Sequence, residues 1–107
     1  MEKLVAYKRM PVWNKDTMPE AVQRKHNTKV GTWGKITVLK GTLKFIELTE
    51  DGEVIAEHLF EAGADNPMAQ PQAWHRVEAA TEDVEWYLEF YCKLEDYFPK
   101  KYNSNPV

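Results

Sequence analysis

Segments rich in apolar and β-branched residues recur at short spacing along the chain, and polar turn residues separate them. This pattern is typical of short β-strands. Strands are expected over residues 4–8, 21–26, 35–40, 43–48, 53–60, 74–80 and 85–92. The one helix candidate, residues 94–98, is a single turn. The pattern therefore predicts an all-β domain, and a small barrel would close such a sheet without leaving exposed edges.

Turn residues predict how the strands connect. Gly41 and Thr42 give the two-residue spacing of a tight hairpin between segments 35–40 and 43–48. Asp51 and Gly52 supply the backbone freedom that a turn before segment 53–60 needs. We expect one cupin-like β-barrel domain over residues 1–98, followed by a polar tail at 99–107.

Alternation assigns faces in two of these segments. In segment 85–92 one face is wholly apolar and is expected in the core: Trp86, Leu88, Phe90 and Cys92. The other face would meet water or a polar cavity: Glu85, Tyr87, Glu89 and Tyr91. In segment 74–80, His75 and Val77 share one face.

Composition narrows the class of protein. The 107 residues suit one domain, and 43% hydrophobic with 29% charged residues is ordinary for a folded chain. The net charge of −3 argues against a nucleic-acid partner, which needs a basic surface. No apolar run is long enough for a membrane span or a signal peptide. Cys92 is the only cysteine, so we expect a soluble, cytoplasmic protein without a disulfide.

Two histidines are candidates for ligand binding. His26 lies near Lys25, Lys29 and Lys35, which form either an anion-attracting mouth or a solvated charged face. His75 follows a proline-containing loop and Trp74 at the start of a strand. It is either a ligand-binding group at a barrel rim or a structural imidazole.

The remaining candidates are weaker. His58 is expected to be structural or solvent-facing. Glu89 lies between Tyr87 and Tyr91 on one strand face, where it is a metal ligand, a base or an exposed carboxylate. The sequence lacks a nucleophile elbow, a phosphate loop, a GxGxxG motif and a paired CxxC. No catalytic residue is therefore assigned.

Several motifs in combination resemble a known family, the tellurite-resistance-associated cupin-like domain. They lie within residues 12–91 and are VWNKDTMP at 12–19, His26, TWGK at 32–35, VLKGTLKF at 38–45, PQAWHRVEA at 71–79 and LEF at 88–90. The resemblance implies a double-stranded β-helix fold. In that family the domain occurs alone or fused in front of an S-adenosylmethionine-dependent methyltransferase that detoxifies tellurite. No S-adenosylmethionine site is expected here, because the chain lacks a βαβ unit with a glycine-rich loop.

The same resemblance implies a metal site with departures from the general cupin pattern. The glutamate of the first cupin motif falls on Gly34, and its histidines fall near Asn27 and Lys29. The second motif supplies His75. A site would use His26 and His75, with Glu78 or Glu89 as the carboxylate. Such a set suits Fe(II), Mn(II), Ni(II) or Zn(II).

Three functions follow as expectations. The first is a metal- or anion-binding cupin in tellurite or oxyanion stress, with a ligand pocket formed by Trp33, Lys35, Trp74 and Tyr87. The second is a non-catalytic module that binds or senses a small molecule. The third is a structural domain that forms a homodimer through the tyrosine-rich segment 85–91. The sequence leaves open whether the protein is an enzyme.

Overall fold

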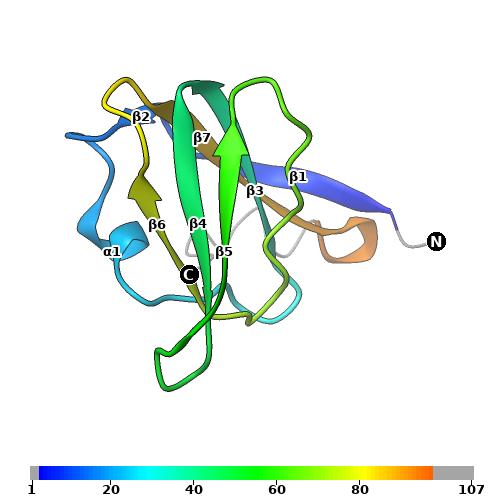
Figure 1. The fold of residues 1–107 in the computed structure, drawn as a ribbon. Helices are drawn as coiled ribbons and strands as arrows, with labels where there is room; N and C mark the ends of the chain where they lie inside the picture. The colour runs from blue at the N-terminus through cyan, green and yellow to red at the C-terminus, as the bar shows by residue number, and fades with distance from the viewer. Residues whose placement is uncertain (1–2, 98–107) are drawn as a thin grey trace.

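The computed structural model describes residues 3–97, which form two antiparallel sheets (Figure 1). The first sheet contains β1 (Leu4–Arg9), β2 (Trp13–Asn14), β3 (Trp33–Lys40) and β7 (Glu85–Lys93). The second sheet contains β4 (Thr42–Leu48), β5 (Val54–Glu61) and β6 (His75–Ala79). The two helical turns are α1 (Glu20–Gln23) and η1 (Leu94–Asp96). The all-β prediction is confirmed, whereas the predicted tail at 99–107 lies outside the described residues.

Each sheet is organised around one central strand. β7 pairs with β3 along residues 85–91, and β1 and β2 share its other edge. β4 lies between β5 and β6. Both strands contribute fully buried side chains, such as Trp86 from β7 and Leu43 from β4. The expected apolar face of residues 85–92 is confirmed, because Trp86, Phe90 and Cys92 are buried and Leu88 packs against the core.

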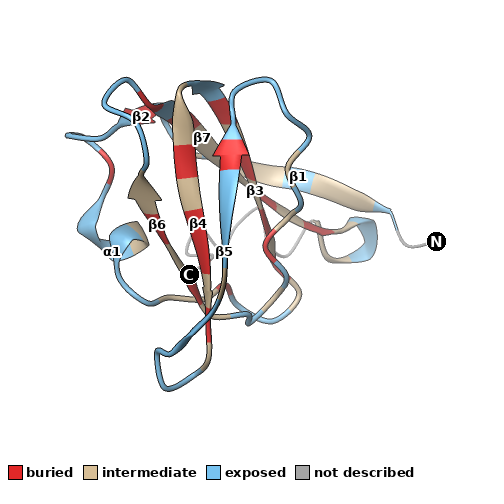
Figure 2. Ribbon diagram, in the orientation of Figure 1, coloured by how far each residue is buried: buried red, intermediate tan, exposed pale blue. Residues whose placement is uncertain are grey.

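The hydrophobic core lies between the two sheets, where buried segments of β3, β4, β5 and β7 face one another (Figure 2). Aromatic rings make specific contacts within it. Trp13 meets Trp86 edge-on with ring centroids 5.2 Å apart, and Phe45 stacks on Phe60 at 5.0 Å. The edge-on and stacked contacts are favoured geometries for aromatic pairs, so each pair stabilises neighbouring strands on the inner face of one sheet.

The turn at Gly41 differs from the predicted hairpin. β3 and β4 do not pair; β3 joins the first sheet and β4 the second, so the chain crosses between sheets at Gly41. The residue has φ +69°, a conformation that glycine adopts readily. Gly41 packs against the segment that connects β6 to β7. In that segment the Thr81 hydroxyl accepts a hydrogen bond from the Thr42 amide at 2.9 Å. Two corners of the fold therefore pack together, which local spacing could not indicate.

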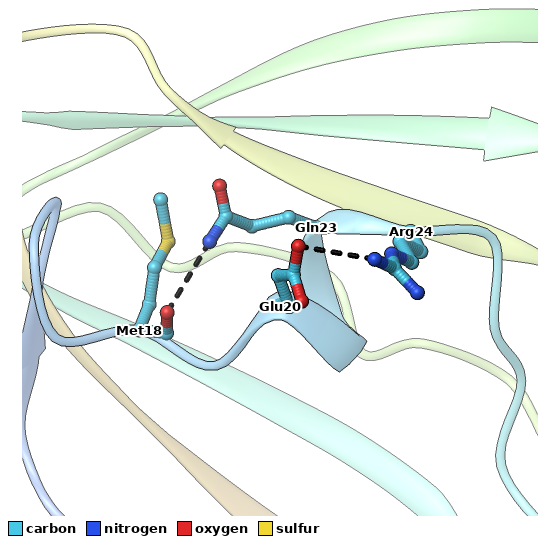
Figure 3. Close-up of polar contacts among 4 residues, drawn as sticks. All are labelled: Met18, Glu20, Gln23 and Arg24. Atoms are coloured by element: carbon cyan, nitrogen blue, oxygen red, sulfur yellow. Dashed lines mark hydrogen bonds and ion pairs between the residues drawn. The ribbon is translucent and has the colours of Figure 1, made fainter.

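The predicted strand at 21–26 is also wrong, because its first part forms α1. Pro19 precedes the helix with extended backbone geometry and Glu20 opens its first turn, where a negative charge is favoured. The Arg24 guanidinium donates to the Glu20 carboxylate at 3.0 Å, and the Gln23 side-chain amide donates to the Met18 carbonyl at 3.2 Å (Figure 3). These local contacts favour a helical turn over an extended strand.

Two smaller predictions are confirmed. The turn at Asp51 and Gly52 connects the antiparallel strands β4 and β5, and Gly52 has φ +90°. The helix candidate after β7 is the single turn η1, although residue 98 lies outside the described part. Among residues 3–97, no helix has the length and apolar character needed to cross a bilayer.

Candidate functional site

A cavity of about 310 Å³ lies between the two sheets and is walled mainly by apolar side chains. Residues from both sheets and from the segment around α1 line it: Lys8, Met10, Trp13, Pro19, Ala21, Val22, His26, Thr28, Gly34, Ile36, Ala69, His75, Val77, Trp86, Leu88 and Phe90. The volume lies near the lower end of the range for ligand-binding pockets. The cavity is therefore a candidate site for a small molecule.

Strand periodicity explains which side chains reach the cavity. On β3, Gly34 and Ile36 face inward, while Trp33 and Lys35 alternate to the other face. Because Gly34 has no side chain, it leaves space in the wall. A Cβ atom there would lie 3.6 Å from the Ala69 Cβ and from the Leu88 side chain, which is ordinary contact. The cavity is thus open partly because a glycine occupies an inward position.

The segment around α1 closes one side of the cavity. Pro19, Ala21 and Val22 line the wall, and α1 packs beside β6 (Figure 1). The segment is connected to β6 by His26, whose backbone forms two hydrogen bonds with His75, at 2.9 and 3.0 Å. These bonds attach the segment to the free edge of β6, so α1 lies beside the second sheet.

His26 and His75 also meet through their rings. The ring centroids lie 4.3 Å apart in an edge-on arrangement, and the His75 ring also stacks on Phe45, with centroids 5.1 Å apart. Only 5% of His75 is exposed. The structure therefore brings together the two histidines that the sequence analysis placed in a metal site.

Burial keeps both imidazoles neutral. It lowers the pKa of His75 to about 4; the nearby His26 acts in the same direction, while the Ala73 carbonyl and Glu47 oppose it. Burial also lowers the pKa of His26, with the Arg24 carbonyl opposing. That carbonyl accepts a hydrogen bond from His26 Nδ1 at 2.9 Å. The neutral ring therefore has its proton on Nδ1, and Nε2 has a lone pair.

Two nitrogens of residues that line the cavity are buried without a hydrogen bond of ordinary geometry within residues 3–97. They are His75 Nδ1 and Trp86 Nε1. A buried polar group that lacks a partner costs about 1–3 kcal/mol, and such groups are uncommon in folded proteins. Both residues line the cavity. Because almost none of the surface of either nitrogen is accessible, both atoms lie behind the surface of the cavity and not on it.

The proposed carboxylate ligands lie away from the two histidines. Glu78 lies on the outward face of β6, where its carboxylate pairs with the Arg76 guanidinium. Glu89 alternates away from Leu88 and Phe90, which line the cavity, and lies opposite Lys35 in register. No group of three His, Cys, Asp or Glu side chains suited to a metal occurs in the described part of the chain. The residues present therefore do not complete a set of two histidines and one carboxylate.

The four residues predicted for the pocket wall do not line this cavity. Trp33 donates from Nε1 to the Gln70 side chain at 3.3 Å. Lys25 lies over the Trp74 ring, 4.6 Å from its centroid, and Arg9 lies 3.9 Å from the Tyr87 ring centroid. Lys35 projects from the outward face of β3. Their part in ligand binding stays a prediction.

Two further residues, His58 and Trp86, complete the comparison of the sequence predictions with the structure. His58 is exposed and pairs with the Glu47 carboxylate at 2.6 Å, which agrees with a structural or solvent-facing role. Trp86, which the sequence predicts to be a core residue, also lines the cavity. The alternation along β7 indicates this position, because Trp86 lies on the same face of the strand as Leu88 and Phe90, which also line the cavity.

The chain is similar to proteins of a known family, one of which is much longer than this chain. The model of the TehB-like domain family matches residues 8–88. The chain is 63% identical over 105 residues to the probable S-adenosyl-L-methionine-dependent methyltransferase TehB of Haemophilus influenzae, covering 98% of this chain and 37% of that protein. The chain thus spans little more than a third of that relative.

Two solved structures share the fold. The crystal structure of TehB from H. influenzae matches with a TM-score of 0.90 and 63% identity, over 97% of this chain and 36% of that one. A crystal structure of an Escherichia coli K12 protein matches with a TM-score of 0.75 and 27% identity. That match covers 82% of this chain and 89% of the E. coli chain, so the two-sheet domain is also found in a chain of similar length.

Proposed function

The chain belongs to the TehB-like domain family, the tellurite-resistance family that its motifs resemble, and we propose that it is a small-molecule-binding module. It holds an uncharged, mainly apolar ligand in the cavity between the two sheets, without catalysing a reaction. In proteins of TehB length, such a module would bind its ligand beside the methyltransferase that the relative's name describes.

The apolar cavity is the observation that carries this proposal. An ionised ligand would leave water for a wall of mostly hydrocarbon groups, and an unpaired buried charge is costly. The two imidazoles do not offset this cost, because burial keeps them neutral. Binding of an uncharged ligand is instead favoured in proportion to the apolar surface area that it removes from water. The cavity therefore favours a neutral molecule over a small oxyanion.

Filling the cavity tests the proposal. We expect naphthalene to bind the native protein and, at ten times its dissociation constant, to raise the free energy of unfolding by about 1.4 kcal/mol. Gly34→Leu places a branched side chain in the wall and is expected to abolish this stabilisation. Gly34→Ala is the matched control, because its added methyl group makes only ordinary contacts. Thermal unfolding with and without naphthalene measures the effect.

Two results would contradict the proposal. One is a native protein that naphthalene does not stabilise at any soluble concentration. The other is Gly34→Leu that unfolds cooperatively and still binds naphthalene as tightly as the native protein, because binding would then occur outside the cavity.

A metal or oxyanion site is the second candidate function. It is favoured by the 4.3 Å approach of His26 and His75, by the lone pair on His26 Nε2, and by Lys8 in the cavity wall. Neutral imidazoles are common ligands of transition metals. Groups from outside these residues would have to complete the coordination, since Glu78 and Glu89 lie elsewhere.

Metal content separates the two candidates. The protein is purified without chelator or immobilised-metal resin and its metals are measured by elemental analysis. The binding-module proposal predicts that dialysis against a chelator leaves naphthalene binding unchanged. Near-stoichiometric transition metal that is lost in both His26→Ala and His75→Ala, together with loss of naphthalene binding after chelation, would instead support the metal site.

A further inference from the structure

We propose that the free edge of β5 binds an extended segment of another protein, one in which basic and apolar side chains alternate along one face. Such a segment would pair with β5 as a further strand of the second sheet, a known mode of peptide recognition. The edge is separate from the cavity, so this interaction surface does not depend on the small-molecule module.

β5 is an edge strand with an open side. β4 lies between β5 and β6 in the second sheet, and within residues 3–97 β5 pairs with β4 alone (Figure 1). Most residues of β5 are exposed, whereas β4 beside it has no exposed residue (Figure 2). An open edge of this kind presents backbone N–H and C=O groups to which another strand can bind.

The register with β4 shows which backbone groups of β5 are available. At one end of this ladder the Ala62 N–H donates to the Gly41 carbonyl at 3.1 Å. Hydrogen-bonded and non-bonded pairs alternate in an antiparallel ladder, so Phe60 and His58 also bond to β4. The residues between them direct their N–H and C=O groups to the open side: Glu57, Leu59 and Glu61.

The side chains along the outward face of β5 alternate in character. Glu57 and Glu61 are exposed acids, and Leu59 between them is 61% exposed. Ile55, beside the bulge near the start of the strand, is 65% exposed. From residue 55 to residue 61 this face therefore presents apolar, acidic, apolar and acidic side chains in turn.

The two carboxylates select a basic partner. The Glu57 carboxylate lies 3.9 Å from the Lys44 ammonium, and Glu61 has no ion pair within residues 3–97. Opposite charges that face each other across two strands are stabilising, and like charges are destabilising. If two copies of β5 paired, each glutamate would face a glutamate or an apolar residue. A segment with lysines opposite Glu57 and Glu61, and apolar residues opposite Leu59 and Ile55, complements the whole edge.

Three capped peptides test the proposal with the native protein labelled with ¹⁵N. The probe is VTKTVTKTV, which reads the same in both directions and so fits either strand orientation. The controls are VTETVTETV, which reverses the charge, and KKTTTTVVV, which keeps the composition without the alternation. We expect only the probe to bind and to slow hydrogen exchange at the amides of Glu57, Leu59 and Glu61. The amides of His58 and Phe60, which bond to β4, should change little.

Two pairs of variants separate charge from strand pairing. Glu61→Lys is expected to weaken binding of the probe about tenfold. Glu95→Lys makes the same change in charge at an exposed position of η1 and should leave binding near the native value. Leu59→Pro removes an N–H on the open side, which edge strands tolerate, and is expected to abolish binding. Leu59→Ala keeps that N–H and should still bind.

Four results would overturn the proposal. The first is a probe that does not bind at any soluble concentration, and the second is equal binding of KKTTTTVVV. The third is equal weakening by Glu61→Lys and Glu95→Lys, which would show a general attraction between charges. The fourth is protection of the same amides at high protein concentration without peptide, together with a dimer in sedimentation, because the partner would then be a second copy. The peptide comparison uses the native protein, so it decides the question even where a variant does not fold.

Discussion

Replacement of Gly41 by alanine is expected to destabilise the domain by about 2–5 kcal/mol, because two costs combine. The first is the positive φ of +69°, which alanine adopts poorly. The second is steric. An added Cβ would lie 2.3 Å from Thr81 Oγ1, 2.5 Å from Asp83 Oδ1 and 3.1 Å from the Val84 Cα. Thr81 cannot move away freely, because its hydroxyl accepts a hydrogen bond from the Thr42 amide.

Gly63→Ala is the matched control for this measurement. Gly63 also has a positive φ, +78°, but nothing lies within 4 Å of the position that its Cβ would occupy. Only the backbone cost of about 1–2 kcal/mol should therefore appear. Urea unfolding of both variants gives the two values. Equal losses at Gly41 and Gly63 would show that the packing of the two sheet crossings contributes little to stability.

Acidification is expected to lower the free energy of unfolding by about 3 kcal/mol through His75 alone. In the native protein the pKa of His75 is about 4, against 6.5 for an ordinary histidine. Between these two values the unfolded chain binds more protons than the folded chain. Stability therefore begins to fall as the pH drops below about 6.5, and the loss from His75 is complete below about pH 4. The lowered pKa of His26 adds a loss of the same sign.

Denaturant unfolding at pH 7.5 and pH 4.5 measures this dependence. His75→Phe is expected to be less sensitive to acid than the native protein, because it removes the group with the lowered pKa and keeps an aromatic ring against Phe45. His58→Phe is the control. His58 lies exposed on β5, so this variant reports the effect of the same exchange of imidazole for phenyl outside the core. Identical pH profiles for the native protein and His75→Phe would contradict a buried, neutral His75.

The sequence alone determined features that depend on neighbouring residues. Six of the seven expected strand segments followed from local propensity and turn residues, the exception being 21–26. The faces of residues 85–92 followed from a period of two. The same alternation placed His75 and Val77 together, and both are buried. Such features are local because a strand exposes alternate side chains to opposite faces wherever it lies in the fold.

Only the tertiary structure decided how these pieces meet. The spacing at Gly41 fits a hairpin, but the two strands enter different sheets because a second corner of the chain packs against that glycine. The cavity arises where inward faces from both sheets and the segment around α1 enclose a space. Glu78 and Glu89 alternate away from this space, although His26 and His75 reach it. Contacts between distant segments set these positions, and no local pattern in the chain encodes them.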